Sequence, residues 1–428
     1  MISRTAAEKG TKGSHWVVPG GDGLVNFGKA LDLGCEFESL RLEAAARVIP
    51  DKLPQTGDEL WRFTRPQQFQ VDDPTQTCGC EISLAPWGDI SARSGMCGLG
   101  LLKGREAVAA ELDLFKYLAG KGQDDISAQV PVNLQTALTA SIHLLVVEKN
   151  ARISKPLLLS QIPLERSCAQ AVPWIVVLLQ PGAQLTLVED LNFDFDGLFY
   201  PRLEIVARDN SVFDFVSMQR LNSKASYLGR HRFHLERDVS ARVLHAFLGS
   251  RVSRLDLECR LLGQGASIDL RSVYVADGKG HIDFHPTQEH ISPHCQSRLL
   301  SKGVVRDRAR AVYYGYIRVA EGAQKTDAYQ TNRNLLFSSE ARADSIPNLE
   351  IKANDVRCSH GSSVGQVGAE ELFYLMSRGL GREAAEKLLV EGFFEEVLAG
   401  YLNPEICAAA GAAVVERLKH GSGSSRIE

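Results

Sequence analysis

A loose repeat of short strands is the feature that most constrains how this chain of 428 residues can fold. From about residue 135, short runs of alternating apolar and polar residues recur, each introduced by a turn residue and then Ala or Ser. In five copies these small residues lie 25 to 32 positions apart, at Ala151, Ala183, Ser211, Ala241 and Ala266. A period of two residues indicates strands with one buried face. Such strands without helices between them predict a β-solenoid, and the alternative is a β-sandwich whose turns share the pattern by coincidence.

Helical periodicity appears near the two ends of the chain. We expect N-terminal helices over residues 36–48 and 105–118, a linker over 120–125, and C-terminal helices over 369–378, 382–399 and 403–420. Asn403, Pro404 and Glu405 supply an N-cap, a proline at the first helical position and an acid in the first turn. The predicted organisation is a mixed N-terminal region over 1–130, a solenoid core over 131–365, a helical domain over 366–420 and a flexible tail over 421–428.

Composition excludes several classes of protein. Hydrophobic residues make up 44% of the chain and charged residues 23%, which is typical of a folded protein and not of a disordered one. The net charge of −4 excludes a globally basic nucleic-acid-binding protein. No apolar run approaches the roughly 20 residues that a membrane-spanning helix needs. The N-terminus lacks the apolar segment of a signal peptide, so the sequence predicts a cytoplasmic protein.

Nine cysteines are spread thinly along the chain, and an odd, sparse set favours reduced thiols over a disulfide framework. Cys78 and Cys80 form a Cys-x-Cys pair, with Cys97 some way downstream. A structural zinc site needs four ligands, and no nearby histidine completes this set. We therefore expect Cys78, Cys80 and Cys97 to be free thiols.

The strongest chemical motif is Cys358-Ser359-His360, within the stretch 355–361. Residues two apart in a strand point to the same face, and thiolate and imidazole are both good ligands for iron or zinc. Two ligands do not complete a tetrahedral site, so the others would come from elsewhere in the chain or from another chain. The alternative is that both residues are buried and purely structural.

Two further clusters of polar residues are not predicted to form a metal or ligand site. One holds His281, Asp283, His285, His290, His294 and Cys295. Because Gly280, Pro286 and Pro293 interrupt it, we expect a polar loop with paired histidines and retain only His290 as a candidate. The other is a basic stretch that contains Arg298, Lys302, Arg306, Arg308, Arg310 and Arg318. These side chains could bind phosphates or an acidic partner, although a solvated outer face of the solenoid explains them equally well.

Enzyme signatures are missing from the sequence. It contains no phosphate-binding Gly-x-x-x-x-Gly-Lys loop, no Gly-x-Ser-x-Gly elbow and no His-Glu-x-x-His. This favours a scaffold or binding role. Two alternatives stay open: a β-helix enzyme acting on carbohydrate, for which Asp194 and Asp196 are the nearest carboxylate pair, and a homo-oligomer that binds metal through Cys358 and His360 of two identical chains.

Residues 290 to 394 resemble the core of the SufB/SufD family of the Suf machinery for iron–sulfur cluster assembly. The resemblance rests on several pieces in the family's order: His290, Lys302-Gly303-Val304, Tyr314 to Val319, Ala323 to Gln330, Asn332 to Leu336, Ala343 to Ile351, Asp355 to Gly361 and Leu372 to Gly379. SufB-type members carry a cysteine about where this chain has Asn332, and a glutamate where it has Gly361. Both are absent here, so the chain is similar to the SufD branch.

The resemblance implies a right-handed parallel β-helix between an N-terminal helical region and a C-terminal helical domain. It implies a non-catalytic subunit that pairs with a SufB-type chain through the β-helix and docks the ATPase SufC on its C-terminal helices, with no nucleic acid and no membrane. His360, with Cys358, would contribute to a nascent iron–sulfur cluster site shared with SufB. SufC dimerisation would pull the helical domains and expose the buried ligands. A homodimer is conceivable for the isolated chain, and some members bind reduced flavin, for which no residue here is identified.

Overall fold

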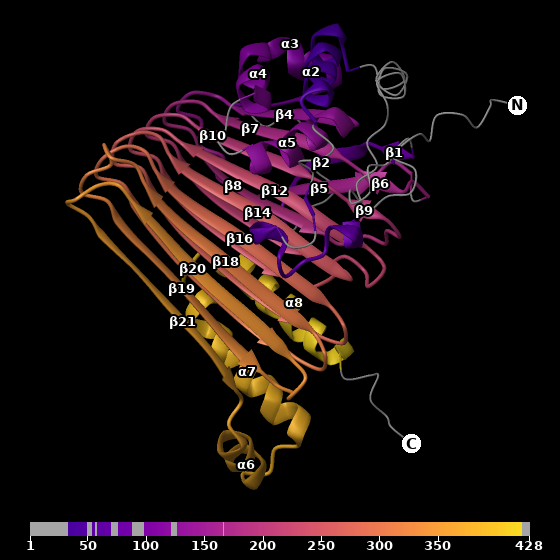
Figure 1. Ribbon diagram of the computed structural model, residues 1–428, viewed down its shortest axis with the longest axis vertical. Coiled ribbons are helices and arrows are strands. Elements are labelled where there is room, and N and C mark those ends of the chain that lie inside the picture. The colour runs from indigo at the N-terminus through magenta and orange to yellow at the C-terminus, as the bar shows by residue number, and fades with distance from the viewer. Residues whose placement is uncertain are drawn as a thin grey trace, which may run out of the picture.

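Two long sheets stacked into a solenoid form the body of the protein (Figure 1). The computed structural model describes residues 33–48, 54–55, 58–69, 76–87, 98–120, 126–165 and 167–421. The chain is mainly β, with 46% strand, and the solenoid has about 8 turns. The strands pair in parallel along the solenoid, while β2 and β3 close its N-terminal end by pairing antiparallel with β5 and β4. The predicted β-solenoid is confirmed, and the sandwich is excluded.

Successive turns of the chain add one strand to each sheet in alternation. The nine-stranded sheet contains β2 (Cys80–Pro86), β5 (Leu157–Pro163), β8 (Gln184–Leu191), β11 (Val212–Gln219), β13 (Ser240–Phe247), β15 (Ser267–Ala276), β17 (Gln296–Val305), β19 (Asp327–Leu336) and β21 (Arg357–Gln366). The main path of the twelve-stranded sheet contains β3 (Leu99–Lys103), β4 (Ser141–Val147), β7 (Pro173–Leu179), β10 (Arg202–Ala207), β12 (Ser226–Leu235), β14 (Val252–Leu261), β16 (His281–His290), β18 (Arg310–Val319) and β20 (Arg342–Ile351). Three short strands lie off this path: β1 (Thr77–Cys78), β6 (Gln170–Ala171) and β9 (Leu198–Phe199).

The repeat has a simple conformational cause. Before six consecutive strands of the nine-stranded sheet, from β8 to β19, the residue two positions upstream has a positive φ of 56° to 76°. These residues are Gly182, Asn210, Asp238, Gly265, His294 and Lys325. Glycine and asparagine adopt this left-handed conformation readily, so the turn can be predicted from the sequence where they occur. At Lys325 the residue type gives no such indication. The register also corrects one predicted position: Ser240 pairs with Val212, so Ala241 is equivalent to Phe213 and not to Ser211.

The interior of the solenoid changes from apolar to polar toward its C-terminal end. The first coils enclose one continuous core that includes Leu187, Phe215 and Val243. In the later coils, Gln330, Asn332 and Asn334 of β19 are buried instead. Tyr274 fits inside because the next coil carries Gly303, where a Cβ atom would lie 1.8 Å from the tyrosine ring.

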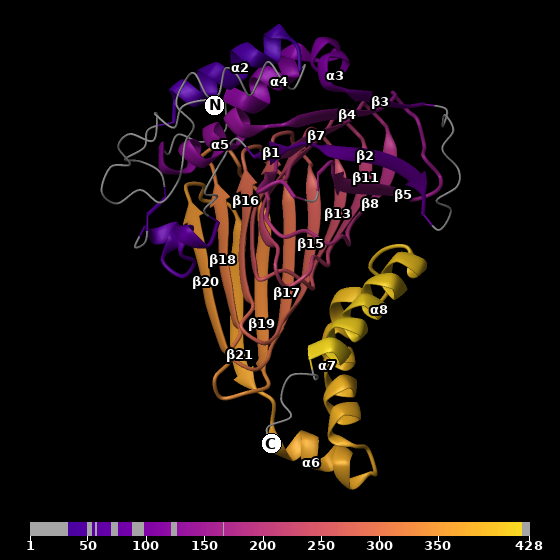
Figure 2. The same cartoon turned by 90° about the vertical axis from the view of Figure 1, so that its right-hand side faces the viewer.

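The N-terminal region covers the first coils (Figure 2). It contains α2 (Cys35–Ala46), η2 (Glu59–Trp61), η3 (Pro66–Phe69), α3 (Gly104–Ala110), α4 (Leu112–Gly120) and α5 (Ile126–Leu138). The helix predicted over 105–118 is divided at Glu111, whose φ of −140° and ψ of 48° are not helical. Trp174 of β7 anchors this region, because its buried ring contacts Phe37 and Phe115. Most of the predicted linker, residues 121–125, lies outside the described residues.

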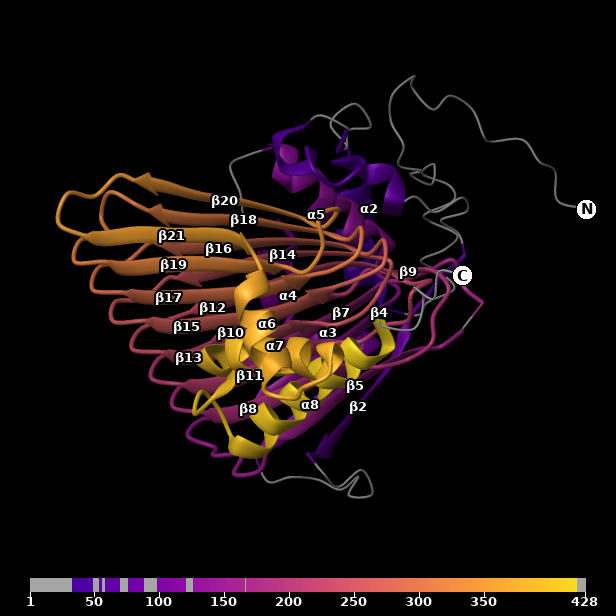
Figure 3. The ribbon, with the colours of Figure 1, turned by 90° about the horizontal axis from the view of Figure 1, so that it is seen from below.

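Three helices follow the last strand: α6 (Ala369–Ser377), α7 (Arg382–Leu398) and α8 (Pro404–Gly421). The predicted N-cap is confirmed, since the Glu405 amide donates to Oδ1 of Asn403 at 2.9 Å. Figures 2 and 3 show α7 and α8 lying along the outer face of the nine-stranded sheet. The tail over 422–428 lies outside the described residues. In the part of the chain that is described, no helix is both long and apolar enough to cross a membrane.

Side chains of the basic stretch hold these helices in place. Nζ of Lys302 donates to the Phe393 carbonyl of α7 at 2.7 Å, and Nη1 of Arg306 donates to the Leu418 carbonyl of α8 at 3.3 Å. Lys302 is only 4% exposed. The expectation of a solvated face was therefore wrong for these two residues, because α7 and α8 fold back over the strand that carries them.

Candidate functional site

The C-terminal end of the solenoid is an open coil. Each of its two strands, β20 and β21, pairs on one side only, with β18 and β19 respectively. In the described part of the chain, no strand pairs with their outer edges. Most residues of β21 are exposed, including those on the face that would point into the solenoid. An edge with free backbone N–H and C=O groups is a template for a further strand.

Cys358 and His360 lie on the inward face of this last coil. Their register partners on β19 are Ala328 and Gln330, which are both buried. Cys358 is half-buried against the small apolar cluster that contains Ala328, and His360 is exposed. The alternative that both residues are buried structural elements does not hold for His360.

The chemistry of the pair suits a metal that arrives with further ligands. Burial raises the pKa of the Cys358 thiol. A hydrogen bond with the Ala328 backbone lowers this pKa by a smaller amount, and the charge of Asp327 raises it slightly further. The thiol is therefore protonated at neutral pH, and a metal would have to displace that proton. Among the described residues, no group of three or more His, Cys, Asp or Glu side chains is placed to hold a metal ion. His360 and Cys358 are thus at most half of a four-ligand set.

A column of polar side chains runs inside the solenoid toward this end. It occupies one register position in successive strands of the nine-stranded sheet, from Glu189 through Ser217, His245, Ser272, Ser301 and Asn332 to Ser362. Asn332, which the sequence singled out as a departure from SufB, is buried and donates to the hydroxyl of Tyr274 at 3.2 Å. No local sequence pattern reveals this column, because its members are about one coil apart in the chain.

The histidine cluster is not a loop. His281, Asp283 and His285 share the outward face of β16, which continues through Pro286, so the expected break was wrong. The ladder with β18 omits His285 and Pro286, and this local gap accommodates the proline. Nε2 of His281 lies 2.6 Å from Oγ1 of Thr64, and Nε2 of His285 lies 2.7 Å from Oδ1 of Asp283. These side chains are paired with one another and lie away from Cys358 and His360.

The remaining candidates also lie outside the open end. His290 is fully buried with Nε2 2.8 Å from the Ser297 hydroxyl, and burial lowers its pKa to about 4. His294 is one of the left-handed turn residues, and Cys295 is buried beside it. Asp194 and Asp196 are exposed, with Asp196 3.4 Å from Nζ of Lys224. Oδ1 of Asp194 accepts from the Asn222 side chain at 3.3 Å, so each carboxylate is held by a residue 28 positions later in the chain.

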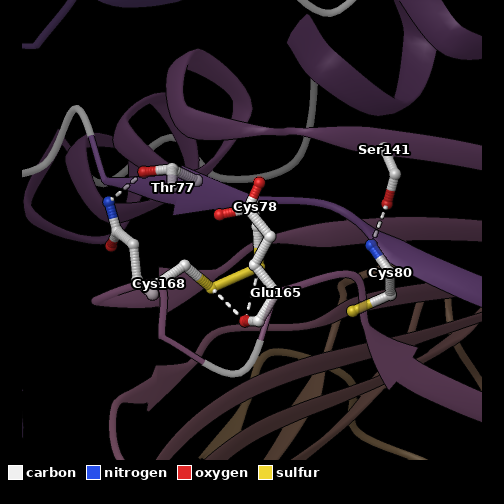
Figure 4. Close-up of a disulfide and its surroundings, with 7 residues drawn as sticks. Thr77, Cys78, Cys80, Ser141, Glu165 and Cys168 are labelled. Atoms are coloured by element: carbon white, nitrogen blue, oxygen red, sulfur yellow. Dashed lines mark hydrogen bonds between the residues drawn. A yellow bond between two sulfur atoms is a disulfide. The ribbon is translucent and has the colours of Figure 1, made fainter.

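One cysteine expectation was wrong. Cys78 is joined by a disulfide to Cys168, 90 residues later (Figure 4). The cause is the pairing of β1 with β6, which places residue 78 beside the loop before β6. Such pairing is invisible in the spacing of the cysteines. Cys80 is a free thiol, as predicted; it is buried, and burial raises its pKa. Cys97 lies outside the described residues.

Comparison with known proteins gives the family. Residues 164–393 match the model of the SUF system FeS cluster assembly, SufBD core domain. The chain is 30% identical over 311 residues to the iron–sulfur cluster assembly protein SufD of Escherichia coli, covering 70% of this chain and 72% of that protein. It is 27% identical over 269 residues to SufD of Bacillus subtilis, covering 62% and 61%. It is 26% identical over 387 residues to a SufBD family protein of Mycobacterium leprae, covering 88% and 94%. The match spans more than half of the chain, so this protein belongs to the SufBD family of iron–sulfur cluster assembly proteins.

Proposed function

We propose that this chain is the non-catalytic SufD-type subunit of an iron–sulfur cluster assembly complex. It pairs with a SufB-type chain at the open end of the solenoid and donates His360, with Cys358 beside it, to a cluster site that the two chains share. A SufC-type ATPase docks on the C-terminal helices. The observation that carries the proposal is an incomplete pair of metal ligands on an uncovered coil.

The open coil has the properties of a protein interface. Its strands offer unpaired backbone groups along both edges, and apolar side chains accompany them. Leu349, Ile351 and Val364 are 37%, 40% and 42% exposed. An edge strand that is long and partly apolar is an aggregation hazard unless another chain covers it. A partner seated there would also bury His360 and bring its own ligands to the cluster.

In this proposal iron and sulfide are cargo, and the subunit itself turns over no substrate. The His360 imidazole is free to bind iron through a ring nitrogen. The Cys358 thiol must lose its proton to bind, so its contribution grows as pH rises. A partner supplying a further thiolate and a carboxylate would complete the set that His360 and Cys358 begin.

Replacing His360 by alanine is expected to abolish cluster assembly by the complex, with loss of at least tenfold in the rate at which the cluster absorbance appears. The matched control is Ser359→Ala, since Ser359 is exposed on the opposite face of the same strand. The measurement is anaerobic reconstitution of the co-purified complex with iron and sulfide. Equal rates for wild type and the His360 variant would remove this residue from the proposal.

Helix α6 is expected to be the ATPase contact. None of its residues is buried, and Phe373, Tyr374 and Met376 are 72%, 56% and 44% exposed. An exposed apolar patch of this kind marks an interaction site. Phe373→Ser should weaken binding of the ATPase at least tenfold by calorimetric titration, whereas Leu42→Ser, an exposed leucine of α2, should not change it. Unchanged affinity in the Phe373 variant would place the docking surface elsewhere.

Co-purification tests the assignment of partners. A tagged chain expressed with its native partners in the absence of oxygen should elute in fixed proportion with an ABC-type ATPase and a SufB-type chain. Recovery of this chain alone, as a homo-oligomer that binds iron without a partner, would contradict the proposal and favour the self-sufficient metal-binding alternative.

A further inference from the structure

The outer face of the twelve-stranded sheet carries a dense layer of charge on the strands beside the N-terminal region. Strands β10, β12, β14 and β16 lie side by side here (Figure 1). Most arginines in the layer have a carboxylate within 3.0 Å, in the pairs Arg202–Glu204, Arg232–Glu258, Arg254–Asp283 and Arg260–Glu289. Pairing of this kind is what burial of a charge requires.

Arg230 of β12 is the exception. It is 8% exposed, and its guanidinium makes no hydrogen bond or ion pair with any described residue. Its neighbours across the sheet are Arg202 on one side and Asp256 on the other. Burial lowers its pKa to about 10, and Arg232 adds to the decrease while Asp256 and Glu258 oppose it, so the group still carries its charge at neutral pH.

The nearby carboxylates are already committed to other arginines. Oδ1 of Asp256 accepts from Nη2 of Arg254 at 3.0 Å. Glu258 lies between Arg232 at 2.7 Å and Arg260 at 3.7 Å. The adjacent Arg232 also has a spare donor, since its Nη2 is buried without a hydrogen-bond partner. Among the described residues, the Arg230 guanidinium and Nη2 of Arg232, on one face of one strand, therefore have no hydrogen-bond partner.

We propose that Arg230, assisted by Nη2 of Arg232, binds a small oxyanion of the phosphate class. A guanidinium matches two oxygens of such an anion with parallel N–H donors. The site admits only a small ligand, because Arg230 is more than nine-tenths buried. The anion would neutralise a cation whose neighbouring carboxylates, on Asp256 and Glu258, are shared with other arginines. This inference is independent of the proposed role in cluster assembly.

The test compares melting temperatures of the full chain in sodium phosphate and in sodium chloride at equal ionic strength. We expect phosphate to raise the melting temperature of the wild type, and calorimetric titration with phosphate to show saturable binding. Arg230→Gln should weaken that binding at least tenfold and abolish the phosphate-specific shift. Arg237→Gln, which alters an exposed arginine paired with Asp209, should retain both.

A second readout separates an anion site from a merely structural arginine. In chloride alone, Arg230→Gln should melt at or above the wild-type temperature, because it removes a buried charge that has no partner. A lower melting temperature in chloride together with an unchanged phosphate response would overturn the proposal. So would a wild type that responds identically to phosphate and chloride. Sulfate and acetate titrated in parallel show whether tetrahedral anions or any carboxylate satisfies the site.

Discussion

Replacing Glu204 by alanine should destabilise the folded chain by about 3–5 kcal/mol, the range measured when one partner of a buried ion pair is removed. Oε1 of Glu204 lies 2.6 Å from Nη2 of Arg202, and Oε2 lies 2.7 Å from Nε2 of His234. Both Glu204 and Arg202 are fully buried. Alanine would leave the Arg202 charge in the interior without its counterion, which is where the cost arises.

The measurement is equilibrium urea unfolding followed by tryptophan fluorescence, since Trp174 lies against the Arg202 guanidinium at 3.9 Å. The control is Glu350→Ala, which breaks the exposed pair with Arg318 and should cost less than about 1 kcal/mol. A double variant, Arg202→Met with Glu204→Leu, should recover most of the loss because no unpaired charge remains. A Glu204 variant as stable as the Glu350 variant would contradict this account.

The same carboxylate should contribute to acid sensitivity. Burial alone would raise the pKa of Glu204, but Arg202, His234 and Arg232 outweigh burial and hold the pKa far below 4.5. A carboxyl with a lowered folded-state pKa stabilises the fold above its unfolded pKa, and this contribution is lost as pH falls toward the folded value. The difference in stability between wild type and Glu204→Ala should therefore shrink below about pH 4.5.

The repeat could be predicted because half of its six left-handed turn positions carry glycine or asparagine, which adopt this conformation readily. Gly182, Asn210 and Gly265 precede strands with clear alternation, so the nine-stranded sheet was visible in the sequence. The strands of the other sheet were harder to find. In β12 every residue is buried, because the N-terminal region and neighbouring strands cover the outward face. Alternation disappears when both faces of a strand are covered.

Cys358 and His360 at the open end were identified from a sequence motif, and the sequence also indicated that they form only part of a metal site. Two potential ligands in one strand could never complete a four-coordinate site. Other features depend on contacts between distant segments. Thr64 meets His281 across 217 positions of sequence, and Lys302 meets the Phe393 carbonyl across 91. No local pattern contains such pairings, so the histidine strand and the helix attachment emerged only from the three-dimensional arrangement.

The disulfide between Cys78 and Cys168 ties the start of the N-terminal strands to the loop before β6. Helices α3, α4 and α5 of the N-terminal region lie in the loop that it closes, whereas α2, η2 and η3 lie outside it. The closed loop spans 90 residues and includes β2, α3, α4 and α5. The side chains of both cysteines are almost fully buried, and the preceding loop residue Leu164 is 64% exposed.

Cleaving this disulfide should lower the free energy of unfolding by about 4–5 kcal/mol, the chain-entropy value for a loop of this length. The expected result is a lower urea midpoint for the wild type in reductant. The double variant Cys78→Ser, Cys168→Ser should match the reduced wild type and show no further response. Cys35→Ser, which alters an exposed free thiol, should keep the full response. Thiol counting by mass spectrometry under non-reducing conditions should find Cys78 and Cys168 unreactive. If reductant does not change the urea midpoint of the wild type and both thiols react, the N-terminal region is held to the solenoid by packing alone.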